Sequence, residues 1–305
     1  MLLMASSYSY GQGCSDAGFC TMGAMKPDQS YSKRTNFKLR AIEVSQYRGQ
    51  STLTPIIYVS NIDFAFSVKK TSFQVKLPYQ AISGNLGKTS GIGDISLSAT
   101  RSIYSTNDYD VNATIGTKIP SNNSDLKKDN DEFGSKGSDF PMYYQTSLGS
   151  VDFIAGISLI SKKWLFAAGY QNALTANNND FKWSEWSEYP SEGYIKSHDR
   201  ATNLKRGTDV MLRVERNWRF SNYNFSLGAL PIFRITKDQI VTQGEYEKLD
   251  RSTGLALTTL ASAGYHFNVN SSIKFIFGLK LVDRDVNPDQ LTRDNVQTIA
   301  YIYRF

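Results

Sequence analysis

The chain has 305 residues, of which 40% are hydrophobic and 20% are charged, and its formal net charge is +6. It contains no run of about 18 apolar residues, which excludes a membrane-spanning helix. A spanning β-barrel is still allowed, because each barrel strand needs only about 9–11 residues with apolar side chains at every second position. Lysine and arginine are scattered along the chain, so the charge pattern does not indicate nucleic-acid binding.

Residues 1–12 resemble the end of a secretory signal peptide, with a short apolar patch followed by small and polar residues. The basic segment that opens such a signal is missing, and a disordered terminus is the alternative. Residues 13–35 are expected to form a periplasmic arm or plug. Its two cysteines, Cys14 and Cys20, predict one disulfide, because export would deliver this pair to an oxidising compartment.

Residues 36–305 show recurrent alternation of apolar and polar side chains, which predicts β-strands with one apolar face. The apolar phase of the first strand slips near Ala41 and Ile42. Alternation alone does not say whether the apolar face meets protein or lipid. The expected strands, about twelve in number, are 36–48, 55–68, 73–79, 94–103, 109–119, 151–159, 164–174, 209–220, 222–235, 255–267, 272–282 and 295–305.

The connections between these strands alternate in length. This alternation shows whether the apolar face meets lipid, as in a membrane barrel, or protein, as in a soluble sandwich. Links near residues 70, 106, 162, 222 and 270 are short, whereas most of the others are long, and the exception is 49–52. Tight turns on one rim and long loops on the other are typical of outer-membrane barrels and have no physical reason in a soluble sandwich. The long links are 80–92, 120–140, 175–206, 237–253 and 283–294. The sequence therefore predicts an all-β, transmembrane, antiparallel up-and-down barrel over 36–305, in the outer membrane of a Gram-negative bacterium.

The face opposite the apolar one is polar or small, as a barrel lumen requires. When the alternation is followed along each strand, nine basic residues and five acidic ones fall on this polar face. This excess of positive charge predicts that the pore prefers anions. The opposing interpretation is that long basic side chains reach acidic partners and fill the narrow bore. The residues are Asp63, Lys69, Lys76, Asp94, Lys118, Asp152, Asp209, Arg213, Glu215, Arg219, Arg234, Lys274, Lys280 and Arg304.

Three segments in the middle of the chain carry recognisable motifs. A Gly-x-Gly-Asp sequence opens a strand at 91–94, a strand ends in Lys-x-Pro at 118–120, and a Leu-Gly-Ser segment precedes another strand at 148–150. Over roughly residues 88–175 the chain thereby resembles the outer-membrane transporters first associated with meta-pathway phenol degradation. The resemblance implies a barrel that passes small hydrophobic molecules.

The last strand ends in alternating aromatic residues, Tyr301, Tyr303 and Phe305. This ending resembles the signal by which the outer-membrane assembly machinery recognises its substrates. The same aromatic face is expected to contact outer-membrane lipid.

Catalytic and metal chemistry are weakly represented. The two histidines, His198 and His266, belong to no local Ser/His/Asp or Cys/His arrangement, so we expect neither an enzyme nor a cofactor. A weak calcium candidate has oxygen ligands at loop offsets 1, 3, 5, 7 and 12, but Pro288 replaces the glycine that such a loop needs, and a solvated acidic loop is the preferred interpretation. The candidate ligands are Asp283, Asp285, Asn287, Asp289 and Asp294.

The longest link, 175–206, is rich in aromatic residues: Trp183, Trp186, Tyr189 and Tyr194. They are expected to form a lid over the pore or a docking surface for a partner protein, with a partly mobile loop as the alternative. Two functions follow. The first is a passive channel for small anionic or hydrophobic solutes. The second is a non-conducting accessory barrel that anchors other outer-membrane proteins through its loops or its N-terminal arm.

Overall fold

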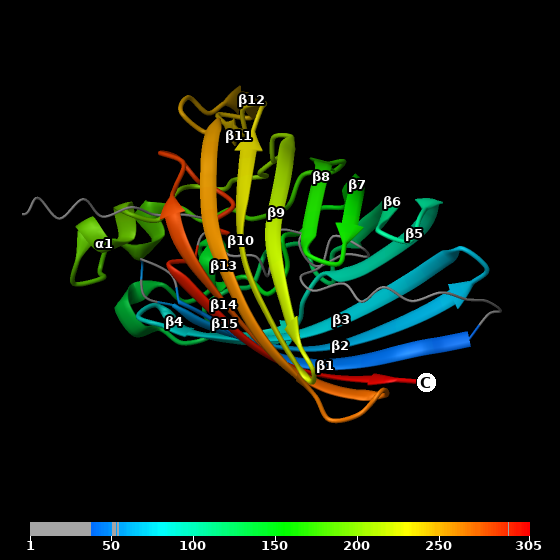
Figure 1. The fold of residues 1–305 in the computed structure, drawn as a ribbon. Coiled ribbons are helices and arrows are strands. Elements are labelled where there is room, and N and C mark those ends of the chain that lie inside the picture. Colours follow the sequence, from blue (N-terminus) through cyan, green and yellow to red (C-terminus); the bar gives the residue numbers. More distant parts are fainter. Residues whose placement is uncertain (1–37, 51–52, 54, 292) are drawn as a thin grey trace, which may run out of the picture.

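The computed structural model describes residues 38–305 apart from 51, 52, 54 and 292, and shows a closed antiparallel barrel (Figure 1). Twelve strand positions make up the wall, and β4 and β5 share one of them. The expected barrel is therefore confirmed. The strands of the wall are β1 (Lys38–Gln50), β2 (Ile56–Val68), β3 (Thr71–Gly84), β4 (Gly87–Ile92), β5 (Ile95–Ser105), β6 (Tyr109–Ile119), β7 (Asp152–Ser161), β8 (Trp164–Ala173), β9 (Asp209–Phe220), β10 (Tyr223–Arg234), β13 (Gly254–His266), β14 (Ser271–Val282) and β15 (Asn295–Arg304).

The last strand closes the ring by pairing with the first. β15 lies antiparallel to β1 from Ala41, opposite Arg304, to Gln50, opposite Asn295. The predicted slip in the first strand is present as a register shift between Leu39 and Ala41 where β1 pairs with β2. A bulge of this kind places one extra residue on one strand and changes the face to which the following side chains point.

One wall position is interrupted at Gly93 and Asp94. β3 pairs with β4 over its last six residues and with β5 over its first six, so β4 and β5 follow one another along the same neighbour. The Gly93 amide donates to the Pro78 carbonyl at 2.9 Å, and a Cβ on Gly93 would lie 2.5 Å from the Gln80 side-chain nitrogen. The chain can approach β3 this closely because Gly93 has no side chain.

The prediction of a long loop at 80–92 was wrong. β3 continues to Gly84, turns tightly at Asn85 and Leu86, and returns as β4. The segment is rich in Gly, Ser and Asn, and this composition indicated a loop although its backbone pairs as a hairpin.

The outer face of the wall is apolar and the inner face is largely polar. Outward side chains such as Ile115, Ile157 and Leu227 are at least half exposed, whereas inward Ser98 and Thr114 are buried. An exposed apolar surface this extensive is stable against lipid and unfavourable in water. Among the described residues, no helix has the length and apolar character needed to cross a membrane.

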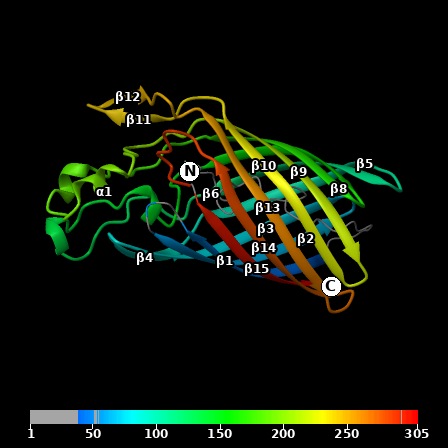
Figure 2. The ribbon, with the colours of Figure 1, turned by 60° about the vertical axis from the view of Figure 1, so that its left-hand side comes forward.

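The long connections gather at one end of the barrel and the C-terminus lies at the other (Figure 2). They contain short elements that the sequence did not predict, including a hairpin within the expected loop 237–253. These elements are η3 (Glu132–Gly134), η4 (Met142–Tyr144), η5 (Trp183–Trp186), α1 (Glu192–Lys196), β11 (Gln239–Thr242) and β12 (Glu245–Lys248).

Candidate functional site: the loop-covered mouth of the barrel

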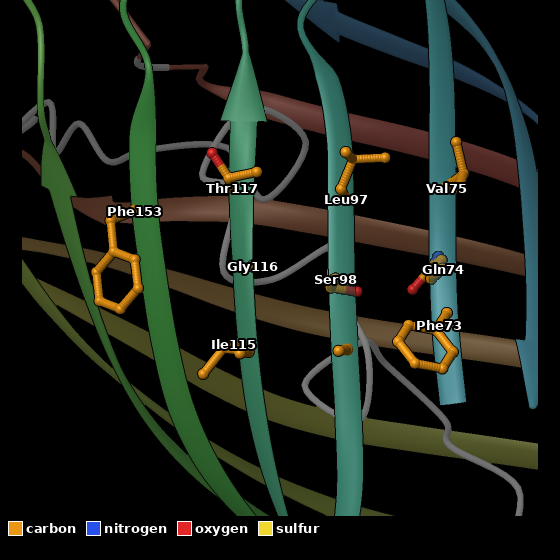
Figure 3. A pocket seen from close by; sticks show the side chains of 10 residues that line it. Phe73, Gln74, Val75, Leu97, Ser98, Ile115, Gly116, Thr117 and Phe153 are labelled. Carbon is orange, nitrogen blue, oxygen red and sulfur yellow. The ribbon is translucent and has the colours of Figure 1, made fainter. Parts of the chain in front are cut away.

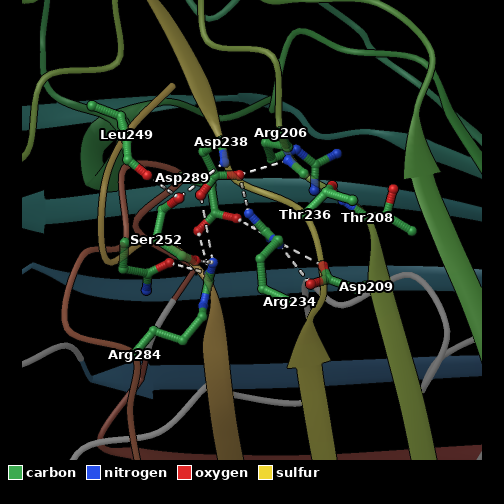
Figure 4. A network of polar contacts seen from close by, with 12 residues as sticks. Arg206, Thr208, Asp209, Arg234, Thr236, Asp238, Leu249, Ser252, Arg284 and Asp289 are labelled. Carbon is green, nitrogen blue, oxygen red and sulfur yellow. Dashed lines mark hydrogen bonds and ion pairs between the residues drawn. The ribbon is translucent and has the colours of Figure 1, made fainter. Parts of the chain in front are cut away.

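Arg234, at the loop end of β10, is the centre of a buried network of ion pairs (Figure 4). Its guanidinium donates to both carboxylate oxygens of Asp209 on β9, at 2.6 and 3.0 Å. It also donates to Asp238 and, at 2.9 Å, to Asp289. One fully buried cation thus holds three carboxylates that come from the wall and from two different loops.

Arg284 completes this network from the segment between β14 and β15. It lies 3.5 Å from Asp238 and 3.4 Å from Asp289. Burial opposes ionisation of Asp289, but Arg284, Arg234 and Arg206 outweigh burial and hold the pKa of its carboxyl below its usual range. Burial raises the pKa of Asp238 despite the two adjacent guanidinium groups. The network fixes residues 235–253 and 283–294 to the wall.

A second ion pair fixes the long loop between β8 and β9. Arg206, in this loop, donates to Asp152 at the start of β7 and, at 3.0 Å, to Ser150. Gln171 on β8 donates to the same Asp152 carboxylate at 2.7 Å. Because Asp152 and Arg206 are both buried, the pair is little screened by solvent.

The three motifs of the sequence resemblance converge at a third anchor. The Asp94 carboxylate lies 3.4 Å from the Lys118 ammonium and accepts hydrogen bonds from the Ser147 hydroxyl at 2.5 Å and the Leu148 amide at 3.2 Å. Gly149 follows with a φ of +69°, and a Cβ there would lie 2.6 Å from the Asn123 carbonyl oxygen. These residues therefore fold the loop between β6 and β7 inwards onto the gap between β4 and β5.

This β6–β7 loop then spans part of the mouth. All residues from 139 to 150 are buried. The Tyr143 amide donates to Gln290 at 2.8 Å, the Tyr144 hydroxyl accepts from the Leu86 amide at 3.1 Å, and Thr89 donates to the Tyr144 carbonyl at 2.5 Å. The loop thereby connects the β3–β4 turn with the segment that precedes β15.

An aromatic cluster packs above this loop around His198. The His198 ring is fully buried, and rings of Tyr143, Tyr144, Phe181 and Tyr194 lie 5.1 to 6.2 Å from it between centroids. Neither ring nitrogen meets hydrogen-bond geometry, although Gln290 lies near enough to oppose the shift that burial causes. Burial lowers the pKa of His198 to about 4, so the ring is neutral at physiological pH.

The predicted lid residues belong to, or border, the same cluster. Trp186 is 1% exposed and packs against Phe140 and Phe181. The Tyr194 hydroxyl donates to the Leu53 carbonyl at 2.7 Å, and Tyr189 stacks on Tyr194. Trp183 is 38% exposed, and its indole nitrogen donates to the His198 carbonyl at 2.8 Å. This loop is thus packed onto the mouth, while its role as a lid or docking surface remains a prediction.

Most of the residues predicted to line the lumen are buried on the inner face of their strands, while their role in lining an open pore remains a prediction. Buried Arg213 and Glu215 form a pair at 2.6 Å, Lys76 lies opposite Asp63 in the register, and Arg304 donates to Ser272 at 3.2 Å. Buried Lys118, Arg234, Lys274 and Lys280 also point inwards, and Arg219 is exposed near the end of β9. Lys69 differs, because β2 ends at Val68 and Lys69 lies exposed in the turn with a φ of 52°.

Loop residues contribute charges that parity could not identify. Arg206, Asp238 and Arg284 lie outside every strand, where no alternation marks an inward side chain. The ion pairs of Arg206, Arg234, Lys280 and Arg284 include four loop carboxylates and two loop guanidinium groups, which reduces the predicted excess of positive charge there. These groups are Asp238, Asp283, Asp289, Asp294, Arg206 and Arg284.

The five ligands of the weak calcium candidate contact basic side chains and do not meet at a common centre. Lys280 lies 2.6 Å from Asp294 and 3.7 Å from Asp283, Arg251 lies 3.0 Å from Asp285, and Arg284 donates to Asn287. Asp289 belongs to the Arg234 network. Within the part of the chain that the structure describes, no group of three or more His, Cys, Asp or Glu residues is arranged to hold a metal ion.

Two further predictions concern the ends of the chain. The signal remnant 1–12 and the arm 13–35, with Cys14 and Cys20, lie outside the described residues. Tyr301, Tyr303 and Phe305 are 41 to 61% exposed at the end of the chain, in β15 and directly after it. Their function as an assembly signal remains a prediction.

No family model matches the sequence, and no curated protein matches it either. Among solved structures, an outer membrane channel from Pseudomonas putida F1 is similar with a TM-score of 0.64 at 12% identity, over 92% of this chain and 99% of that one. The NanC porin has a TM-score of 0.47 at 9% identity, over 87% of this chain and 100% of the porin. The CymD monoaromatic hydrocarbon channel has a TM-score of 0.43 at 10% identity, over 97% of this chain and 98% of the channel.

The Pseudomonas channel shares the fold along nearly the whole of both chains. This similarity and the apolar outer face confirm the barrel that the sequence motifs implied. The chain is therefore an outer-membrane β-barrel with the fold of a bacterial outer-membrane channel.

Proposed function

We propose that the protein is a passive channel for small solutes and catalyses no reaction. The observation that carries the proposal is the set of charged side chains that point inwards from a closed ring of strands. Ionisable groups inside a barrel are costly unless they face one another or a water-filled path, and they mark solute pathways. The similar Pseudomonas protein is described as an outer membrane channel, which supports the same role here.

We further propose that the pore prefers anions. The basic residues at the mouth are compensated by carboxylates, so the preference must come from the opposite, periplasmic half of the wall. There Lys76, Lys274 and Arg304 lie on the inner face together with Asp63 and Glu43, which lie opposite each other on β2 and β1. An excess of positive charge in a narrow space raises the local anion concentration.

Reversal potential across a salt gradient in planar bilayers tests both proposals. The parent is expected to conduct and to prefer anions, and the triple variant Lys76→Gln, Lys274→Gln, Arg304→Gln is expected to lose that preference. The matched control removes three exposed loop lysines by Lys136→Gln, Lys205→Gln and Lys248→Gln, and should retain it. Cation preference in the parent, or a triple variant with unchanged selectivity, would contradict the anion pore, and absence of current would contradict the channel.

The second candidate is a non-conducting barrel that anchors partner proteins. It is favoured by the β11–β12 hairpin, which projects beyond the barrel wall and exposes all four residues of β12 (Figure 2). Copurification from native membranes separates the two functions. A stoichiometric partner together with no bilayer current would favour the anchoring role.

A further inference from the structure

The outer wall contains an apolar groove of about 440 Å³ across β3, β5, β6 and β7 (Figure 3). Phe73 and Phe153 form its two sides and are each 41% exposed. Ala99 and Thr117 lie between them. The strand register sets this arrangement, because Phe73 lies beside Ala99 and Phe153 lies beside Thr117. The small Ala99 and Thr117 side chains leave a hollow in the surface that faces lipid, and the larger Leu97 and Ile115 beside them complete its lining.

A basic cluster lies at the periplasmic end of the groove. On the same face of the β3–β5 pair, the next position after Phe73 and Ala99 is occupied by Thr71 and Arg101. Side chains two residues apart on one strand are about 7 Å apart, a distance that an arginine side chain can span. The adjacent turn contributes Lys69 and Lys70, and the Lys70 carbonyl accepts from the Ser102 amide at 3.0 Å.

These three basic side chains are exposed to the membrane surface. Arg101, Lys69 and Lys70 form no ion pair with any residue that the structure describes. Another outward arginine is different, because Arg216 lies over the rings of Trp164 and Trp218 at 5.0 and 5.8 Å. The Arg101 cluster is therefore available to a ligand that carries negative charge.

We propose that this surface is a binding site for an anionic phospholipid of the periplasmic leaflet. One acyl chain lies in the groove between Phe73 and Phe153, and Arg101, Lys69 and Lys70 bind the phosphate. The short β2–β3 and β5–β6 turns place the cluster at the periplasmic surface of the membrane, where phospholipid headgroups lie. Arginine binds phosphate through two parallel hydrogen bonds, and lysine adds a point charge.

Native mass spectrometry of the full chain in detergent tests the site, with 1-palmitoyl-2-oleoyl phosphatidylglycerol and the matching phosphatidylcholine as probes. The parent is expected to retain one phosphatidylglycerol at least tenfold more than phosphatidylcholine. Arg101→Gln with Lys70→Gln should reduce this preference at least fivefold. The matched control changes two lysines at another periplasmic turn, Lys162→Gln and Lys163→Gln, and should leave it unchanged.

The groove is tested separately by filling it. Ala99→Phe and the smaller change Thr117→Leu should each reduce retention of both lipids in protein that still runs as a folded barrel on unheated gels. Equal retention of the two lipids by the parent would overturn the site, as would a control variant that loses as much preference as the Arg101 variant. Full retention in both filled variants would overturn the acyl-chain position. Bilayer conductance is expected to be unchanged in all of them, so this test is independent of the proposed channel.

Discussion

Asp289 and Arg234 lie 2.9 Å apart at the mouth of the barrel, although 55 residues separate them in the sequence. Arg234 also contacts Asp209 and Asp238, so a single guanidinium compensates three carboxylates. Removing one partner of a buried ion pair leaves an uncompensated buried charge, which is far more costly than replacing both partners by apolar side chains. The mouth is therefore more sensitive to loss of the shared cation than to loss of any single carboxylate.

Arg234→Gln is expected to destabilise the folded barrel by about 3–5 kcal/mol, and Asp289→Asn by clearly less. In the arginine variant Asp238 and Asp289 keep Arg284 but lose Arg234, which raises the pKa of both carboxyls in the folded state. Burial already holds the pKa of Asp238 above its usual value, so the stability lost to this carboxyl should grow as pH rises through its folded pKa. Urea unfolding of detergent-refolded protein at pH 5 and pH 8 measures this.

The control for this series is an exposed ion pair. Lys182 lies 2.5 Å from Asp180, and both side chains are about half exposed, so Lys182→Gln should change stability by no more than about 1 kcal/mol. Equal losses for Arg234→Gln and Lys182→Gln would contradict the central role of Arg234.

The aromatic cluster around His198 should loosen in acid. The folded pKa of about 4 lies below the ordinary value of 6.5, so the unfolded segment binds a proton first as pH falls. The contribution of the neutral His198 ring to the stability of the cluster is therefore fully present above pH 6.5. It declines towards pH 4, by about 3 kcal/mol in all. Hydrogen exchange of residues 139–150, corrected for intrinsic rates, measures the decline at pH 7 and pH 5.

His198→Phe should abolish this pH dependence, because a phenyl ring in the same position does not titrate. His266→Phe is the matched control, since His266 lies at the end of β13 and outside the cluster. An unchanged acid response in His198→Phe would show that another group is responsible.

Gly149→Ala is expected to reduce the yield of folded barrel. The left-handed backbone at φ +69° costs a side chain about 1–2 kcal/mol, and the new Cβ would lie 2.6 Å from the Asn123 carbonyl oxygen and 2.7 Å from the Asn177 Cβ. Gly193→Ala is the control, because Gly193 lies in α1 with nothing within 4 Å. Its stability should be unchanged or slightly higher. Heat-modified mobility on gels measures the folded fraction, and equal behaviour of the two variants would contradict the strain at Gly149.

Trp186→Ala is expected to release the loop 175–206 from the mouth. Its indole is 1% exposed, contacts Phe140 and Phe181, and lies 5.4 Å from the Lys128 ammonium. Removal of such a side chain costs about 3–5 kcal/mol. Single-channel recordings should show larger or noisier conductance, whereas Trp183→Ala, at a 38% exposed position, should resemble the parent. Identical recordings from both variants would show that the aromatic loop does not control the pore.

The sequence by itself determined the barrel wall. Strand positions were predictable because alternation is a local property, and the predicted 109–119 and 209–220 coincide with β6 and β9. Alternation likewise put Arg213, Glu215 and Lys280 on the face opposite the apolar one, and the three side chains are buried; their place along an open pore stays a prediction. Lys69 failed because the alternation was extended one residue beyond the predicted strand 55–68 into the turn, where the backbone no longer alternates.

The mouth was decided by the tertiary structure alone. Asp94 and Leu148 are separated by 54 residues and Tyr143 and Gln290 by 147, and no local periodicity relates such pairs. The hairpins at 80–92 and 237–253 were missed for a related reason, since their polar composition resembles that of loops while backbone pairing determines their shape. The wall follows from the pattern of single strands, whereas the charged and aromatic contacts over the pore exist only because closure of the ring brings distant loops together.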